Sequence, residues 1–181
     1  MTLTPTIASP SDLLCKLARE QYRAFHEPHP VHKADHLYNF CVTALAIKDY
    51  IFEYFGITDP SQKAPYYDVW TKIPELVAAT EIANSSKHLV LRDKKQNLKS
   101  PKTKSVVNAR STVVDVYIDK NTNIHTMKNV VADYEIVLED GKILQLWEFT
   151  NAILHYWQDY FKNNLIPYQK QTEDEYFGNV T

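Results

Sequence analysis

Glycine is scarce in this chain of 181 residues, which contains three glycines and two cysteines. With so few glycines, a glycine-rich phosphate-binding loop is not expected, and no cofactor is predicted. Cys15 and Cys41 fall at apolar positions of helical patterns. This placement predicts reduced thiols in the core of a cytoplasmic protein. No run approaches the roughly 18 apolar residues of a membrane span, and Met1–Pro10 lacks a signal-peptide pattern. These absences predict a cytoplasmic protein without a membrane anchor.

Apolar and aromatic residues, by contrast, are abundant. They make up 44% and 12% of the chain, and twelve residues are tyrosine. This supply is ample for one compact core, so residues 1–168 are predicted to form a single domain. Residues 169–181 are polar and acidic and are predicted to be a loosely held tail.

Charge is distributed unevenly along the chain. The formal net charge is −2, but residues 87–110 carry eight Lys and Arg against one Asp. That segment therefore holds about +7, and the remainder about −9. A basic segment on an acidic body can attract RNA or an acidic protein partner, although a solvated lysine-rich loop is the commoner outcome.

Helical periodicity covers most of the chain. Ser9 as N-cap, Pro10 and Asp12 predict a first helix running to about Phe25. A second, central helix is predicted from about Lys33 to Phe55, where Gly56 ends it. The prolines of residues 58–65 predict a loop, followed by a short helical turn near Tyr67–Ile73. Two more helices are predicted, Pro74 to about Leu91 and about Gln145 to Asn163.

The period changes from 3.6 to 2 between these last two helices. Residues 112–119 and 130–138 alternate and are rich in β-branched residues, while 94–105 are polar and predict a flexible loop. Asp140-Gly141 predicts a tight hairpin to residues 142–144. The expected fold is mainly α: a four-helix bundle with a small antiparallel β-meander, at about 110–144, inserted before the last helix.

The densest group of chemically useful side chains lies around the end of the Pro74–Leu91 helix. On a helix, Asn84, Lys87 and His88 share one face, and Arg92 follows them. Asn84 would orient the imidazole of His88, and Lys87 would lower its pKa. Two interpretations remain open: a buried polar pair that braces the bundle, or a ligand-binding groove in which Lys87 and His88 are the candidate catalytic residues.

Three features of the chain come in an order that resembles a family of bacterial and phage-borne proteins. They are the line Ala83-Asn84-Ser85-Ser86-Lys87-His88, the later Asp140-Gly141 hairpin and the aromatic segment Trp157–Phe161. The resemblance covers about 35–163 and implies a HEPN-like helical bundle, a class that includes ribonucleases of stress response and phage conflict. In that class four to six residues separate an Arg from the catalytic His that follows it. No Arg precedes His88 at this spacing, and a literal match is instead Arg19, which is separated from His26 by six residues on the first helix.

Three functions follow as expectations. The first is a binding or interaction module that forms a homodimer or binds RNA or a protein partner through the basic segment 87–110. The second is a metal-independent ribonuclease with His88 as acid/base and Lys87 and Arg92 as cations for the phosphate. The third is a metal site at His29, His32 and His36, where the last two have the i, i+4 spacing of zinc ligands on a helix.

Overall fold

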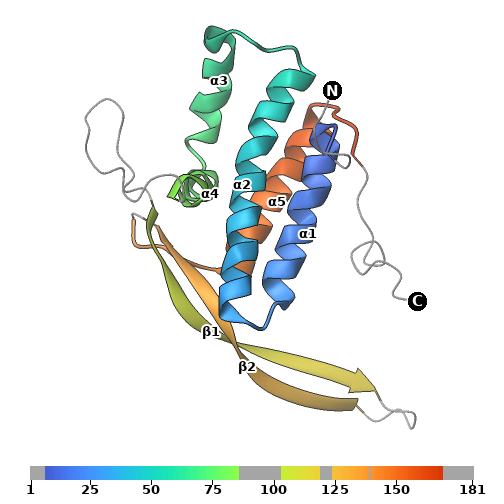
Figure 1. Cartoon of the computed structure of the whole chain (residues 1–181), viewed down its shortest axis with the longest axis vertical. Coiled ribbons are helices and arrows are strands. Elements are labelled where there is room, and N and C mark those ends of the chain that lie inside the picture. Colours follow the sequence, from blue (N-terminus) through green and yellow to red (C-terminus); the bar gives the residue numbers. More distant parts are fainter. Residues whose placement is uncertain (1–6, 86–102, 119–123, 139, 169–181) are drawn as a thin grey trace.

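The computed structural model describes residues 7–85, 103–118, 124–138 and 140–168. Across these ranges the chain forms five helices and one three-stranded antiparallel sheet that precedes the last helix (Figure 1). The fold is therefore mainly helical with a small sheet inserted where the change of period predicts it. No described helix is long and apolar enough to cross a membrane. The elements are α1 (Pro10–His26), α2 (Pro30–Tyr54), α3 (Pro60–Trp70), α4 (Pro74–Ser85), β1 (Thr103–Ile118), β2 (Ile124–Leu138), β3 (Ile143–Gln145) and α5 (Leu146–Asn163).

The start of α1 is the capping box that the sequence predicts. Ser9 Oγ accepts a hydrogen bond from the backbone N–H of Asp12, and the Asp12 carboxylate accepts from the backbone N–H of Ser9. Two N–H groups that the helix leaves unpaired are thus satisfied reciprocally. The end of α2 is also as predicted, because Gly56 follows its cap with φ +66°, a conformation that glycine adopts without a steric penalty.

Helix α3 corrects the prediction of a loop over residues 58–65. Both prolines of that segment lie inside the helix, Pro60 in its first turn and Pro65 in its interior. Asp59 caps the helix by accepting from the backbone N–H of Ser61 at 2.7 Å. A proline in the first turn sacrifices no helical bond, so only Pro65 opposes the helix. The cap and the burial of Trp70 at the other end explain why it forms.

The strands are longer than the sequence predicts. β1 begins at Thr103, within the expected loop 94–105, and the insertion spans 103–145 instead of about 110–144. β1 pairs with β2 from Thr103↔Leu138 to Ile118↔Ile124, and β3 pairs only with Glu135–Val137 of β2. The Asp140-Gly141 turn is confirmed: Gly141 has φ +85°, and its N–H donates to the carbonyl of Leu138 at 3.0 Å.

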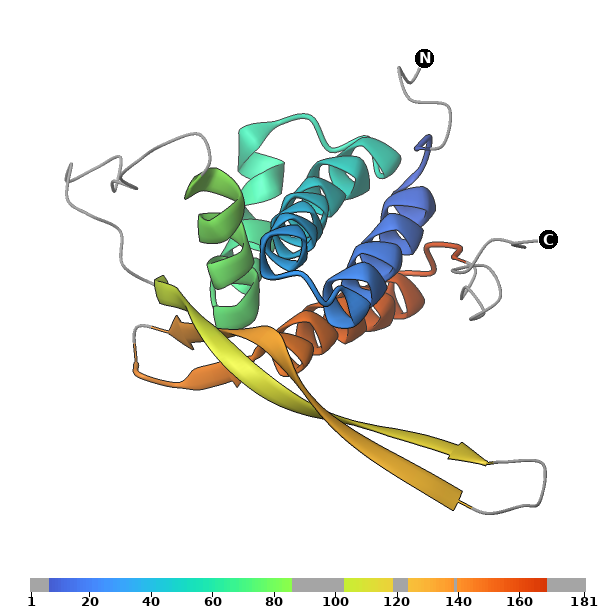
Figure 2. The ribbon, with the colours of Figure 1, turned by 60° about the horizontal axis from the view of Figure 1, so that its bottom comes forward.

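The base of the sheet belongs to the core of the bundle. α1 packs against α2 and α5, α2 packs against α4, and Ile136, Leu138 and Leu144 of the sheet join the apolar cluster that these helices form. Trp70 and Trp157 meet at 5.5 Å between ring centroids and link α3 to α5. The ribbon β1–β2 then continues beyond the helices as a projecting arm (Figure 2).

Candidate ligand-binding site

Only one of the four residues predicted to bind a ligand lies in the described part of the chain. Asn84 is partly buried on the last turn of α4. Lys87, His88 and Arg92 lie outside the described residues, as does most of the basic segment 87–110. Of that segment's charged residues, Arg110 is described as exposed on β1. The predicted grouping of Asn84 with His88 stays a prediction.

A cavity of about 410 Å³ lies between α2, α4 and the base of the sheet. Ser85, on the same turn of α4 as Asn84, is one of its lining residues. The lining is mainly apolar, with two tyrosines and one carboxylate among it, which is the usual composition of a small-ligand site. The lining residues are Ala34, Leu37, Tyr38, Glu81, Ile82, Ser85, Val106 and Tyr134.

Tyr134 is held in place by a bond from the sheet to the bundle. Its hydroxyl donates to the backbone carbonyl of Pro30, in the first turn of α2, at 2.8 Å. This bond ties Tyr134, at the wall of the cavity, to the start of α2. Together with Tyr38 it gives the cavity two aromatic residues, which are suited to contact with a flat ring.

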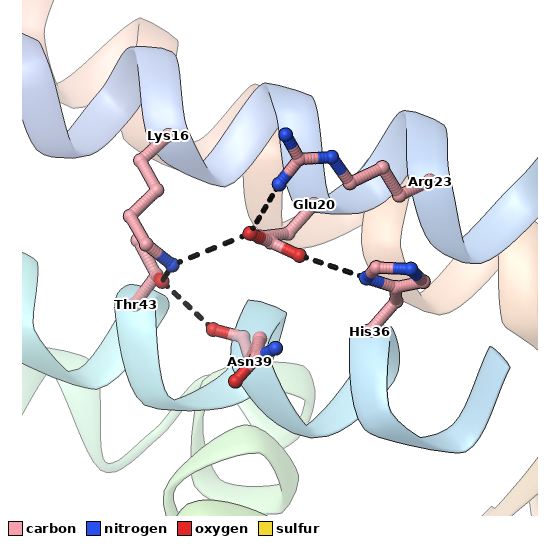
Figure 3. A network of polar contacts seen from close by, with 6 residues as sticks. All are labelled: Lys16, Glu20, Arg23, His36, Asn39 and Thr43. Atoms are coloured by element: carbon pink, nitrogen blue, oxygen red, sulfur yellow. Dashed lines mark hydrogen bonds and ion pairs between the residues drawn. The ribbon is translucent and has the colours of Figure 1, made fainter. Parts of the chain in front are cut away.

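A second polar group, formed where α1 packs on α2, was not predicted from the sequence. The Glu20 carboxylate lies between three nitrogen-bearing side chains, with Arg23 Nη1 at 3.0 Å, Lys16 Nζ at 3.5 Å and His36 Nδ1 at 3.1 Å (Figure 3). Lys16 Nζ also donates to Thr43 Oγ1 at 2.8 Å. These five residues are called the Glu20 network below.

The burial of the Glu20 network indicates a role in packing. The side chain of Glu20 is 6% exposed, whereas those of Lys16 and Arg23 are 30% and 53% exposed. A buried carboxylate needs its partners, and here they come from both helices, so the network fixes how α1 sits on α2. The spacings of Lys16 and Arg23 from Glu20 are visible in the sequence as i, i+4 and i, i+3 pairs, but the contact with His36 depends on tertiary packing.

The histidine-rich turn does not assemble the predicted metal site. The rings of His29 and His32 lie 4.7 Å apart, but the ring of His36 turns to Glu20. Among the described residues, no group of three His, Cys, Asp or Glu side chains has a geometry that could hold a metal ion. The i, i+4 spacing of His32 and His36 is satisfied, but packing of α2 on α1 gives His36 a different partner.

The remaining candidates occupy ordinary surroundings. Cys41 is fully buried, and burial raises the pKa of its thiol far above the ordinary value, so it is not a reactive thiolate. Cys15 is partly buried, and neither cysteine forms a disulfide. His26 lies against Tyr22, at 4.1 Å between ring centroids. Burial of its imidazole, and to a smaller extent the positive charge of Lys33, lowers the pKa of His26.

The comparisons with known proteins add no constraint to these residues: no family model, no curated protein and no solved structure matches the chain.

Proposed function

We propose that the protein is a non-catalytic binding module that holds single-stranded RNA at the cavity between α2, α4 and the sheet. The observation that carries the proposal is the position of this cavity. It opens at the last described turn of α4, immediately before the chain enters the basic segment 87–110. We also propose that the helical part is a HEPN-like bundle and that the module acts in the cytoplasm, in stress response or phage conflict.

Single-stranded RNA fits the chemistry of this place. Bases stack on aromatic side chains, and the cavity offers Tyr38 and Tyr134. Lysines and arginines supply most of the affinity for a phosphate backbone, and residues 87–110 carry about +7. Because Glu81 also lines the cavity, it offers a hydrogen-bond acceptor to the amino group of a base.

Binding is tested by fluorescence anisotropy with a labelled single-stranded RNA of mixed sequence. Ser85→Trp places a large ring in the cavity from an exposed position at the end of α4, and Gln62→Trp adds the same ring at an exposed position of α3, away from the cavity. We expect Ser85→Trp to weaken binding by about tenfold or more and Gln62→Trp to leave it unchanged. Equal affinities of the two variants would exclude the cavity as the site.

The basic segment is tested separately with Lys94→Glu/Lys95→Glu/Lys99→Glu. The affinity of the wild type for RNA should fall steeply with rising salt, and the triple variant should show both weaker binding and a shallower salt dependence. Absence of RNA binding by the folded wild type would contradict the proposal and direct the search to an acidic protein partner.

A diverged ribonuclease is the second candidate function. The observation that favours it is that Asn84, on the turn beside the cavity, precedes His88 by four residues, so a neutral imidazole beside Lys87 and Arg92 would lie near bound RNA. Incubating the RNA with wild type and with Lys87→Ala/His88→Ala in EDTA separates the two functions. Cleavage by the wild type alone establishes the ribonuclease, whereas bound and intact RNA supports the binding module.

A further inference from the structure

Four side chains with polar groups border the cavity between α2, α4 and the sheet. Glu81 and Ser85 lie four residues apart on α4 and therefore share the face of this helix that borders the cavity. Tyr38 comes from α2 and Tyr134 from β2. Polar groups of three elements thus surround one space, and their hydrogen-bonding capacity decides which ligand fits it.

The contacts around the cavity fix the direction of two of its hydroxyl groups. Ser85 Oγ donates to the backbone carbonyl of Ile82 at 2.6 Å, and the hydroxyl of Tyr134 donates to that of Pro30 at 2.8 Å. A hydroxyl has one proton, so both oxygens can only accept any further hydrogen bond. The carboxylate of Glu81 also only accepts. Three of the four polar side chains therefore offer acceptors, and a complementary ligand must bring donors.

Among the four bases of RNA, guanine is the one that brings two adjacent donors on its Watson–Crick edge. These are N1–H and the 2-amino group, which point in the same direction. Adenine, cytosine and uracil each present one donor group there, next to a ring nitrogen or oxygen that a carboxylate repels. Single-stranded bases are read on this edge, because it is unpaired. An acceptor-rich cavity therefore favours guanine over the other three bases.

We propose that the cavity selects guanine, with the carboxylate of Glu81 accepting from N1–H through one oxygen and from the 2-amino group through the other. The proposal rests on the proposed RNA-binding function and names the base that enters the cavity. A carboxylate has about four acceptor positions, so these two bonds leave room for protein partners of Glu81. The flat purine lies against Tyr38 and Tyr134, which contribute stacking without discriminating between bases.

The test compares labelled oligouridines that carry one different nucleoside at the centre. Guanosine presents both donors, inosine lacks only the 2-amino group, and adenosine lacks the N1 proton. In 7-deazaguanosine the Watson–Crick edge is intact, and only N7 is replaced. By fluorescence anisotropy, we expect the wild type to bind the guanosine and 7-deazaguanosine forms equally. The inosine and adenosine forms should bind about tenfold or more weakly, because a two-bond contact to a base discriminates on this scale.

A pair of variants assigns the selection to Glu81. Glu81→Gln keeps the size of the side chain but replaces one acceptor oxygen with a donating amide, so it cannot accept from both groups of guanine. Glu75→Gln is the matched control in the first turn of the same helix, where Glu75 pairs with Lys142 at 3.3 Å and is not one of the described residues that line the cavity. We expect the ratio of guanosine to inosine affinity to fall to about one in Glu81→Gln and to stay at the wild-type value in Glu75→Gln.

The outcomes separate this inference from the function on which it rests. If the wild type binds all the oligonucleotides with equal affinity, guanine selection is overturned and RNA binding stands. Binding to none of them would overturn both. The comparison of guanosine with inosine uses the wild type alone, so it does not depend on the folding of a variant. A guanosine preference that survives in Glu81→Gln, folded by circular dichroism, would overturn the role of Glu81.

Discussion

At the scale of single residues, Glu20 is the side chain that depends most on its partners. It accepts contacts from Lys16 and Arg23 on its own helix and from His36 on α2, and its side chain is almost fully enclosed. The two cationic side chains of α1 are partly exposed, so their ion pairs contribute little by themselves. The larger contribution comes from the buried carboxylate contact that joins two helices.

Replacing Glu20 therefore tests the Glu20 network. Glu20→Gln keeps the size of the side chain but removes the charge that Lys16, Arg23 and His36 share, and we expect a loss of about 1–3 kcal/mol in the free energy of unfolding. Urea denaturation measures this loss. Glu53→Gln, at an exposed position of α2, is the control and should change stability by less than about 0.5 kcal/mol. Similar losses in both variants would mean that the network contributes nothing specific.

Asp12 makes the stability of α1 depend on pH. The backbone N–H of Ala8, and also the N–H and hydroxyl of Ser9, donate to its carboxylate and hold its pKa below the ordinary 3.8. Because the pKa is lowered in the folded state, the carboxylate stabilises the fold above pH 3.8, and this contribution is lost as pH falls through the folded pKa.

We therefore expect wild type to exceed Asp12→Asn in stability by about 1 kcal/mol at pH 7, and the difference to shrink as pH falls below the ordinary pKa of Asp12. Urea denaturation of both proteins from pH 7 to pH 2 measures the difference. A gap of constant size over this range would show that the charge of Asp12 has no part in capping α1.

At the scale of elements, α3 contains a residue that opposes its own helix. Pro65 has no N–H to donate to the preceding turn, and it is exposed, so its ring gains little from packing. Pro65→Ala restores the helical bond but also increases the freedom of the unfolded chain, so we expect a net gain of about 1–2 kcal/mol. Thermal unfolding measures the gain. Pro60→Ala, in the first turn, should give little or no gain, and a destabilised Pro65→Ala would contradict this account of α3.

The elements that the sequence predicts well are those whose signals are local. The capping box at Ser9, the glycine that ends α2 and the Asp140-Gly141 turn each depend on a few adjacent residues. The sequence predicts only the C-terminal part of α3, as a helical turn near Tyr67–Ile73, because the two prolines before it favour a loop. Pro60 nevertheless occupies a favourable position, and Trp70 anchors the other end in the core. The strands that the sequence predicts are too short, because backbone pairing extends β1 through residues whose side chains give no alternating pattern.

The sequence predicts less of the candidate site, because that site depends on contacts between elements that are distant in sequence. The sequence places Asn84 on the helix that begins at Pro74, but the cavity at Ser85, the next residue, needs Tyr134 of the sheet and Tyr38 of α2, which come together only in the fold. Likewise, the spacing of His36 from His32 makes it a candidate metal ligand, but the packing of α1 on α2 gives His36 the carboxylate of Glu20 as its partner. Contacts between elements distant in sequence leave no periodic signal.

At the scale of the whole molecule, the sheet has two parts with different roles. Its base shares the core of the helices through Ile136, Leu138 and Leu144, and a wall of the cavity is formed by Val106 and Tyr134. The paired residues 112–118 and 124–130 beyond the base contribute no residue to the described core or to the lining of the cavity. Stability and RNA binding should therefore depend on the base of the ribbon.

Shortening the ribbon separates these roles in one protein. Ser111 and Val131 are paired across β1 and β2, so residues 112–130 can be replaced by Asn-Gly, a two-residue turn that closes an antiparallel hairpin. We expect the shortened protein to unfold cooperatively within a few degrees of the wild type by circular dichroism, because the helical core is unchanged. It should bind RNA with the affinity of the wild type. Loss of cooperative unfolding would mean that residues 112–130 are needed for folding, and loss of RNA binding with the fold intact would place part of the RNA site on them.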